Sequence, residues 1–354
     1  MSSPAALTDR LLTGDKGAIA RLVTWAENGD SRFPAAISAI HANTGKAWRV
    51  GVTGPPGAGK STLVNALAKH ERESKKTVAI LAVDPSSPFT GGALLGDRIR
   101  MEERTLDPGV YIRSMASRGS HGGLARAAVD ACDVMDAAGF DAILVETVGV
   151  GQAEYDVVVT ADTVVVVLCP GAGDGIQAMK AGLLEVADVL VVNKSDLPGA
   201  DRLQVDLEEA VHIRAFGRGS GEAQLAWIPP VVACSASNGD GVAQVAQAIG
   251  SHRSHLETRG LATVRREKRL AQVRRAVEER LEERLWERGG LAEEARGLLD
   301  SGRAPYDVVE TIVASILSPD LPPGGSPGEK APGKSGGKGE EKKVVEEKRG
   351  AKSA

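Results

Sequence analysis

The sequence predicts an α/β protein with a doubly wound, mostly parallel sheet, and three observations support this fold class. Short runs rich in Val and Ile alternate with longer segments that can form helices, the order expected of βαβ units. Aromatic residues make up only 3% of the chain, so its cores must be built from aliphatic side chains, as around buried parallel strands. A glycine-rich segment, residues 51–62, lies between the first apolar run and a helix-compatible segment, which is the context of a phosphate-binding loop.

The expected elements follow in chain order. Two helices, at 7–26 and 33–41, precede the sheet, and Pro34 is tolerated in the first turn of the second. Ligands of such sheets bind at the carboxyl ends of the strands, where the glycine-rich segment lies. Strands are predicted at 49–53, 77–83, 110–114, 142–146, 163–168, 189–193 and 230–235, with helices among them at 61–73, 124–138 and 176–187.

An amphipathic helix is predicted after the sheet, at 264–286, and another apolar helix at 305–317. The first can pack on its own domain or serve as a dimerisation arm, and periodicity does not distinguish the two. From residue 318 onward Pro, Gly, Lys and Glu dominate, and too little apolar surface remains to offset the entropy of ordering. The apolar side of the first helix carries Leu270, Val273, Val277, Leu281 and Leu285.

Composition and charge narrow the class of protein. The 354 residues carry a net charge of −4, so no global basic field attracts nucleic acid or a membrane surface. Cys132, Cys169 and Cys234 are far apart in the sequence, which argues against a disulfide framework or a zinc knuckle and favours a reducing cytosol. No apolar stretch approaches the roughly 20 residues that span a bilayer, and the N-terminus lacks the pattern of an export signal. We expect a cytoplasmic protein.

The segment GVTGPPGAGKST explains how phosphate would be held. Its glycines let the backbone curl, so that successive N–H groups point at phosphate oxygens near the start of the following helix. Lys60 can then reach the β- and γ-phosphates, and the Ser61 hydroxyl can ligate Mg²⁺. The predicted nucleotide contacts in this loop are Gly54, Pro55, Pro56, Gly57, Ala58, Gly59, Lys60, Ser61 and Thr62.

The motif NKSD, directly after the strand at 189–193, predicts guanine as the base. The Asp196 carboxylate can accept hydrogen bonds from the N1–H and 2-amino groups of guanine, whereas adenine has an acceptor at N1 and nothing at C2. Sites with such matching discriminate by roughly 10⁴ to 10⁵. The last strand ends in a Ser-Ala-Ser segment like those whose backbone touches guanine O6. The predicted guanine contacts are Asn193, Lys194, Asp196, Ser235, Ala236 and Ser237.

Catalytic candidates lie in the segment ETVGVGQ, where Glu146 and Gly149 occupy the place of the Asp-x-x-Gly segment of many GTPases. The carboxylate can hold Mg²⁺, directly or through water, and the Gly149 N–H can sense the γ-phosphate. Val150 stands where Ras-like proteins carry the glutamine that orients the attacking water. Intrinsic hydrolysis should therefore be slow, at roughly 10⁻⁴ s⁻¹. Gln152 is either a substitute for that glutamine or a structural switch residue.

The segment 83–101, VDPSSPFTGGALLGDRIRM, is more specific than any phosphate-binding loop. Together with the motifs above and GAGDGIQAMKAG at 171–182, it resembles the MeaB/ArgK family of P-loop GTPases, relatives of the human methylmalonic aciduria type A protein. The likeness extends from the N-terminal helices to about residue 317.

The resemblance implies a homodimeric G-protein chaperone. Such a protein gates the loading of adenosylcobalamin and protects or reactivates an acyl-CoA mutase, chiefly methylmalonyl-CoA mutase. The resemblance also implies that Asp84 and Asp97 join Ser61 and Glu146 around Mg²⁺. It further implies that the segment 171–182 is an additional switch, in which Lys180 can engage phosphate or a carboxylate of the partner.

Two alternatives remain open. A nickel-inserting GTPase would display Cys and His ligands, but only His252 and His255 lie close together, and we expect this pair to be solvated at a helix end. An ATPase or kinase of basic amino-acid transport would need ATP to fit the base site, which Asp196 opposes.

The expected organisation of the chain has four regions. They are an N-terminal helical extension at 1–45, a P-loop GTPase domain at 46–250, a C-terminal helical dimerisation region at 251–317 and a disordered tail at 318–354.

Overall fold

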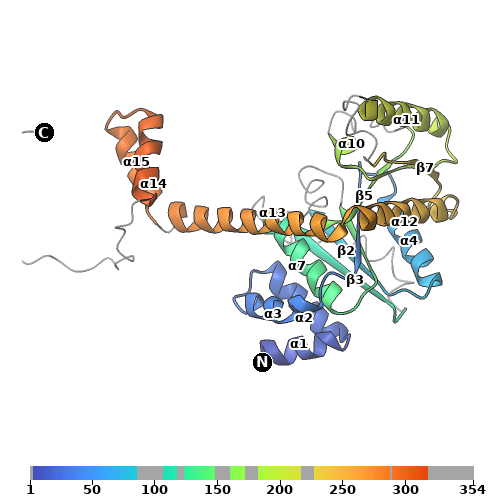
Figure 1. Cartoon of the computed structure of the whole chain (residues 1–354), viewed down its shortest axis with the longest axis horizontal. Coiled ribbons are helices and arrows are strands. Elements are labelled where there is room, and N and C mark those ends of the chain that lie inside the picture. Colours follow the sequence, from blue (N-terminus) through green and yellow to red (C-terminus); the bar gives the residue numbers. More distant parts are fainter. Residues whose placement is uncertain are drawn as a thin grey trace, which may run out of the picture. The chain divides into compact units, whose positions relative to one another are not determined.

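The computed structural model describes residues 3–85, 107–117, 123–147, 160–171, 182–216, 227–287 and 289–317. The chain divides into two units, Met1–Leu281 and Glu282–Ala354. In the described part of the first unit, seven strands form one sheet in the order β3-β2-β4-β1-β5-β6-β7 (Figure 1). All six neighbouring pairs are parallel, which confirms the predicted fold class. The strands are β1 (Trp48–Thr53), β2 (Val78–Pro85), β3 (Val110–Ser117), β4 (Ala142–Thr147), β5 (Thr163–Leu168), β6 (Val189–Asn193) and β7 (Val231–Cys234).

Helices cover both faces of this sheet. One face packs on α4 (Lys60–Glu73) and α12 (Val242–Arg259). The other packs on α7 (Gly123–Ala137), on α11 (Ala200–Phe216) and, through α7, on the N-terminal helices. Figure 1 shows α7 and the N-terminal helices on the side of the sheet away from α4. Since successive strand residues point to opposite faces, the buried valines and isoleucines divide between two cores.

Three α-helices, rather than the predicted two, precede the sheet: α1 (Pro4–Leu12), α2 (Lys16–Glu27) and α3 (Phe33–Ile40). The expected helix at 7–26 is wrong because the chain turns at Gly14, which has φ 79°. Asp15 then caps the second helix, its carboxylate accepting a hydrogen bond from Ala18 N at 3.0 Å. Glycine commonly ends a helix and aspartate commonly caps the start of the next one. The Gly14-Asp15 pair in the sequence could therefore have predicted this break.

The helix expected at 176–187 is described only as a short segment, α10 (Leu183–Val186), which begins after Gly182 with φ 73°. Residues 172–181 lie outside the described part of the chain. Helices α11 and α12 were not predicted from the sequence. The hydrophobic periodicity of both helices is weak, so neither gives a clear helical signal in the sequence.

Helix α13 (Leu261–Glu282) packs against the rest of the first unit through its charged side. The Arg265 guanidinium donates to both carboxylate oxygens of Asp162, at 2.9 and 2.7 Å, and Arg269 pairs with Asp133. The apolar stripe faces solvent instead: Leu270, Val273, Val277 and Leu281 are 61%, 60%, 50% and 49% exposed. The expectation that Leu285 shares this stripe is wrong.

The second unit is a helical hairpin of α14 (Leu291–Asp300) and α15 (Pro305–Leu317). A π-helical turn, Glu283–Glu287, precedes it. Because this turn changes the helical register, Leu285 packs into the core of the hairpin, with Leu291, Val308 and Ile312. None of the described helices is both long and apolar enough to cross a bilayer.

Candidate nucleotide-binding site

The phosphate-binding loop connects β1, at the centre of the sheet, to α4. Gly54 has φ 137°, and a Cβ there would lie 2.1 Å from the Val167 carbonyl oxygen of β5. Gly59, with φ 91°, is the residue before the first turn of α4, and a Cβ there would lie 2.2 Å from Asn193 Nδ2. Glycine is therefore required at both positions, for conformation and for close approach.

The functional side chains of this loop lie at the start of α4. Lys60 is buried, and its amine donates to the carbonyls of Gly54 and Pro55 at 2.8 and 2.9 Å, so the charge lies within the curl of the loop. Thr62 is exposed at the end of the same turn. Pro55 and Pro56 form the rim of the loop, and Ala58 is fully buried beneath Gly57 and Gly59.

The predicted metal ligands Ser61 and Glu146 are in contact, because the Ser61 hydroxyl donates to the Glu146 carboxylate. Glu146 is 6% exposed and lies in β4 opposite Val52 of β1, so that the end of β4 adjoins the loop. A hydroxyl and a buried carboxylate are hard oxygen donors of the kind that Mg²⁺ prefers, and this pair therefore fits a magnesium ion.

Asp84 has its backbone at the same edge of the sheet. It lies two residues beyond Ala82, which is in register with Glu146. The side chain of Asp84 lies outside the described part of the structure, as do Asp97, Gly149, Val150, Gln152 and Lys180.

On the base side, Asn193 joins two loops. Its amide Nδ2 donates to the Ala58 carbonyl at 2.8 Å, and its Oδ1 accepts from Ala236 N at 3.0 Å. The Lys194 amine donates to the Gly57 carbonyl at 2.8 Å, with its own backbone at φ 58°. The motif after β6 thus fixes the phosphate-binding loop relative to the segment after β7.

Asp196 and Ser235 form the other contact between these loops. The Ser235 hydroxyl donates to Asp196 Oδ1 at 2.6 Å. This hydrogen bond, together with one from the backbone of Asp196, lowers the pKa of the carboxyl below its ordinary value. The group is thereby kept as an acceptor for N–H donors. Ser237 lies beside it, and its hydroxyl donates to Asn238 Oδ1 at 3.2 Å.

The turn that shapes the base-side loop was missed in the sequence. Ser235 N donates to the Asp240 carbonyl at 2.9 Å, and Gly241 has φ 78° with its Cβ position 2.3 Å from the Ala233 carbonyl. The Asn-Gly and Asp-Gly dipeptides at 238–241 are turn signals and could have predicted this closure.

The histidine pair considered for nickel is not at a solvated helix end. His252 is 3% exposed, its Nδ1 lies 2.9 Å from the Thr163 hydroxyl, and its ring packs 5.0 Å from that of Trp227. The expectation of a solvated pair is therefore wrong for His252. Within the described residues, no three His, Cys, Asp or Glu side chains are grouped as metal ligands.

Comparison with known proteins decides the family. A model described as methylmalonyl-CoA mutase-associated GTPase MeaB matches residues 19–290. This chain belongs to the MeaB family of GTPases. A Pyrococcus abyssi protein named as a GTPase is 45% identical over 320 residues, which cover 89% of this chain and 97% of that protein. The GTPase ArgK of Escherichia coli is 36% identical over 76% of this chain and 82% of its own length.

A solved structure supports the same assignment. The crystal structure titled LAO/AO transport system kinase aligns with a TM-score of 0.68 and 28% identity, covering 89% of this chain and 98% of that one. As a MeaB-family member, the chain is a GTPase that binds guanine nucleotide and hydrolyses GTP. The resemblance found in the sequence is confirmed.

Proposed function

We propose that this GTPase is a chaperone of an adenosylcobalamin-dependent acyl-CoA mutase of the methylmalonyl-CoA mutase type. In this role it gates the loading of the cofactor and protects or reactivates the mutase. The observation that carries the proposal is the match of residues 19–290 to a family described as mutase-associated. A GTPase that holds its state until a partner acts suits such a role, and Val150 in place of a water-orienting glutamine favours slow hydrolysis.

The proposed roles of the described residues follow from their contacts. Ser61 and Glu146 would hold Mg²⁺, with Asp84 and Asp97 as further ligands, and the metal would neutralise charge on the phosphates. Lys60 exchanges its loop carbonyls for phosphate oxygens. Gly149 is proposed to sense the γ-phosphate. Gln152 and Lys180 are proposed to act in hydrolysis or in the switch toward the partner.

In this proposal Asp196 recognises the base, and its replacement tests whether the carboxylate accepts hydrogen bonds from guanine. In Asp196→Asn, an amide N–H faces the 2-amino group of guanine, which is also a donor, so this hydrogen bond is lost. Xanthine has a carbonyl acceptor at C2, to which the amide can donate. We expect the variant to prefer xanthosine over guanosine triphosphate, measured by competition binding. Tight binding of ATP by the wild-type protein would contradict the guanine site and favour the ATPase or kinase alternative.

The chaperone role is tested by single-turnover GTP hydrolysis with and without a purified cobalamin-dependent mutase. We expect the mutase to raise the slow basal rate, and the two proteins to co-purify. Asp196→Asn is the matched control: the same mutase should stimulate it with xanthosine triphosphate and not with GTP. If no cobalamin-dependent mutase encoded beside this chain raises the rate, the chaperone role is wrong.

We also propose that the chain forms a homodimer through α13. Its charged side contacts the rest of the first unit, while Leu270, Val273, Val277 and Leu281 form an exposed apolar stripe. Such a stripe, repeating every three to four residues, is typical of a helix that packs on another helix.

A further inference from the structure

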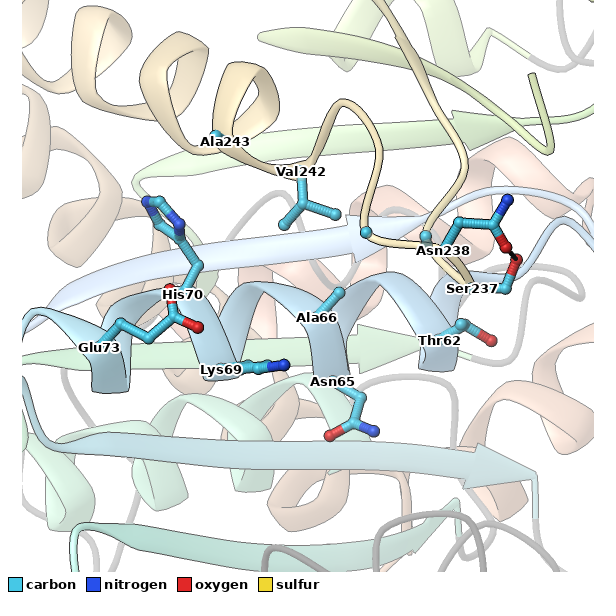
Figure 2. A pocket seen from close by; sticks show the side chains of 12 residues that line it. Thr62, Asn65, Ala66, Lys69, His70, Glu73, Ser237, Asn238, Val242 and Ala243 are labelled. Carbon is cyan, nitrogen blue, oxygen red and sulfur yellow. Dashed lines mark hydrogen bonds between the residues drawn. The ribbon is translucent and has the colours of Figure 1, made fainter. Parts of the chain in front are cut away.

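A groove of about 400 Å³ lies beside the base-side loop and continues along α4 beyond the nucleotide contacts described above. One wall is a single face of α4, whose lining residues recur at helical spacing. The other wall is the loop after β7 and the first turn of α12 (Figure 2). The polar side chains along the groove are those of Thr62, Asn65, Lys69, His70, Glu73, Ser237 and Asn238.

The groove begins where the ribose of a bound nucleotide would lie. The phosphates are held at the start of α4 and the base beside Asp196, so the ribose that joins them lies over Thr62 and Ser237. Both side chains line the groove, which continues along α4 as far as Glu73. Lys69 lies seven residues beyond Thr62, about 10 Å along the helix axis. This placement rests on the guanine site proposed above.

Several hydrogen-bond donors line the groove without a partner among the described residues. With the described residues, neither the Lys69 amine nor the His70 ring forms a hydrogen bond or ion pair. Side chains of a helix lean toward its N-terminus, and Figure 2 shows the Lys69 amine directed toward Asn65, at the ribose end. Asn238 uses its Oδ1 to accept from Ser237, which leaves its amide N–H groups available.

We propose that this groove is a subsite for phosphate carried on the ribose, so that the protein binds guanosine 3′-diphosphate 5′-diphosphate in addition to GTP and GDP. Lys69 supplies a charge-assisted hydrogen bond to the 3′-phosphates, and the Asn238 amide adds N–H donors from the facing loop. Glu73, one turn beyond Lys69, opposes the same ligand by repulsion. GDP carries no phosphate at the 3′ position and does not depend on these side chains.

Isothermal titration calorimetry with GDP and with guanosine 3′-diphosphate 5′-diphosphate tests the subsite. We expect the second nucleotide to bind the wild-type protein about tenfold tighter than GDP, the scale of one hydrogen bond to a charged group. Lys69→Ala should remove this gain and leave GDP affinity within about twofold. The matched control is Lys75→Ala, which removes an exposed lysine just beyond α4 that does not line the groove.

A second variant tests the subsite by a gain. Glu73→Gln should strengthen binding of the 3′-diphosphate nucleotide about two- to threefold, the scale of one exposed charge interaction, and misfolding cannot produce such a gain. Normal GDP binding with no preference for the 3′-diphosphate nucleotide would overturn the subsite alone. Equal effects of Lys69→Ala and Lys75→Ala would do the same. Failure of GDP itself to bind would overturn the guanine site on which the subsite depends.

Discussion

Asn193 is the residue on which the geometry of the nucleotide site depends most. It is 2% exposed, and both ends of its amide are paired, one with Ala58 of the phosphate-binding loop and one with Ala236 of the base-side loop. A buried amide that loses a partner costs about 1–3 kcal/mol. The side chain therefore holds its rotamer, and through it the two loops keep a fixed separation.

Gly59→Ala should displace the Asn193 side chain, and Gly57→Ala should not. Both glycines have positive φ, but a Cβ at Gly59 would lie 2.2 Å from Asn193 Nδ2, whereas a Cβ at Gly57 meets nothing within 4 Å. We expect Gly57→Ala to cost about 1–2 kcal/mol of backbone strain. Gly59→Ala should cost about 1–3 kcal/mol more and weaken GDP binding at least about tenfold. Urea unfolding and calorimetry measure both; equal losses would show that Asn193 is not displaced.

His252 carries a pH effect on stability. Burial, and then the charges of His255 and Lys268, lower its pKa to about 4, from about 6.5 in the unfolded chain. Between these values the unfolded state binds the proton and the folded state does not, so the stability that His252 contributes above pH 6.5 is lost as pH falls toward 4. Asp188, its neighbour, has its pKa raised to about 6 by burial and acts in the opposite direction.

Replacing the histidine separates these two effects. His252→Gln removes the group whose protonation in the unfolded state destabilises the fold in acid, and it leaves Asp188 in place. The free energy of unfolding of the variant should therefore rise relative to that of the wild type as pH falls from 7 to 4.5. The expected change in the difference of unfolding free energies is about 2 kcal/mol. Urea unfolding at pH 7, 5.5 and 4.5 measures it. A difference that stays constant with pH would contradict the lowered pKa.

At the scale of elements, α13 is held by charge rather than by apolar packing. Arg265 donates to Asp162 and to the Gly45 and Ala47 carbonyls, and so joins the helix to the start of β5 and to the chain before β1. Asp133 of α7 accepts from both Arg269 and the buried Arg49. The Asp162 and Asp133 carboxylates are nearly buried, and each is paired with an arginine. Removing the arginine would leave a nearly buried charge without its partner, which is costly.

Arg265→Ala should lower the free energy of unfolding by about 2–4 kcal/mol, because the 6% exposed Asp162 carboxylate loses its ion pair. Arg274→Ala is the control on the same helix. Arg274 is 81% exposed, and among the described residues its ion pair is with Glu278 on the same helix, so its loss should cost less than about 0.5 kcal/mol. Similar losses in urea unfolding for the two variants would argue against a structural role of the Arg265 contacts.

At the scale of the whole molecule, we propose that the exposed apolar stripe of α13 forms the interface of a homodimer. Val273 and Val277, 60% and 50% exposed, lie at the middle of the stripe, where a partner helix would bury them. Four apolar side chains turned to water on one helix are unfavourable for a monomer.

Val273→Glu should convert a wild-type dimer to a monomer, since burying one charge in each protomer opposes an apolar interface. Light scattering coupled to size exclusion measures the mass, with Arg274→Ala as the control that should remain dimeric. A wild-type protein that is monomeric at micromolar concentration, or a dimer that Val273→Glu leaves intact, would contradict dimerisation through α13.

The sequence by itself determined the sheet and the order of the motifs on it. Val- and Ile-rich runs predicted all seven described strands to within three residues at either end. A buried strand is recognisable in this way because its apolar residues are adjacent in the sequence. The loop before Lys60 and the NKSD motif were readable because their chemistry depends on adjacent residues. The break at Gly14 and the turn at 238–241 were equally local, and were missed.

Only the tertiary structure decided which sides of the elements are buried. Periodicity predicted the apolar stripe of α13, but its charged side docks because Asp162 and Asp133, 103 and 136 residues away from their arginines in the sequence, lie beneath it. His252 is buried because Thr163, 89 residues earlier, meets its ring. The groove along α4 likewise exists only because the loop after β7 folds beside that helix. Such pairings depend on strand order and on complementary charge across the fold, which no local pattern contains.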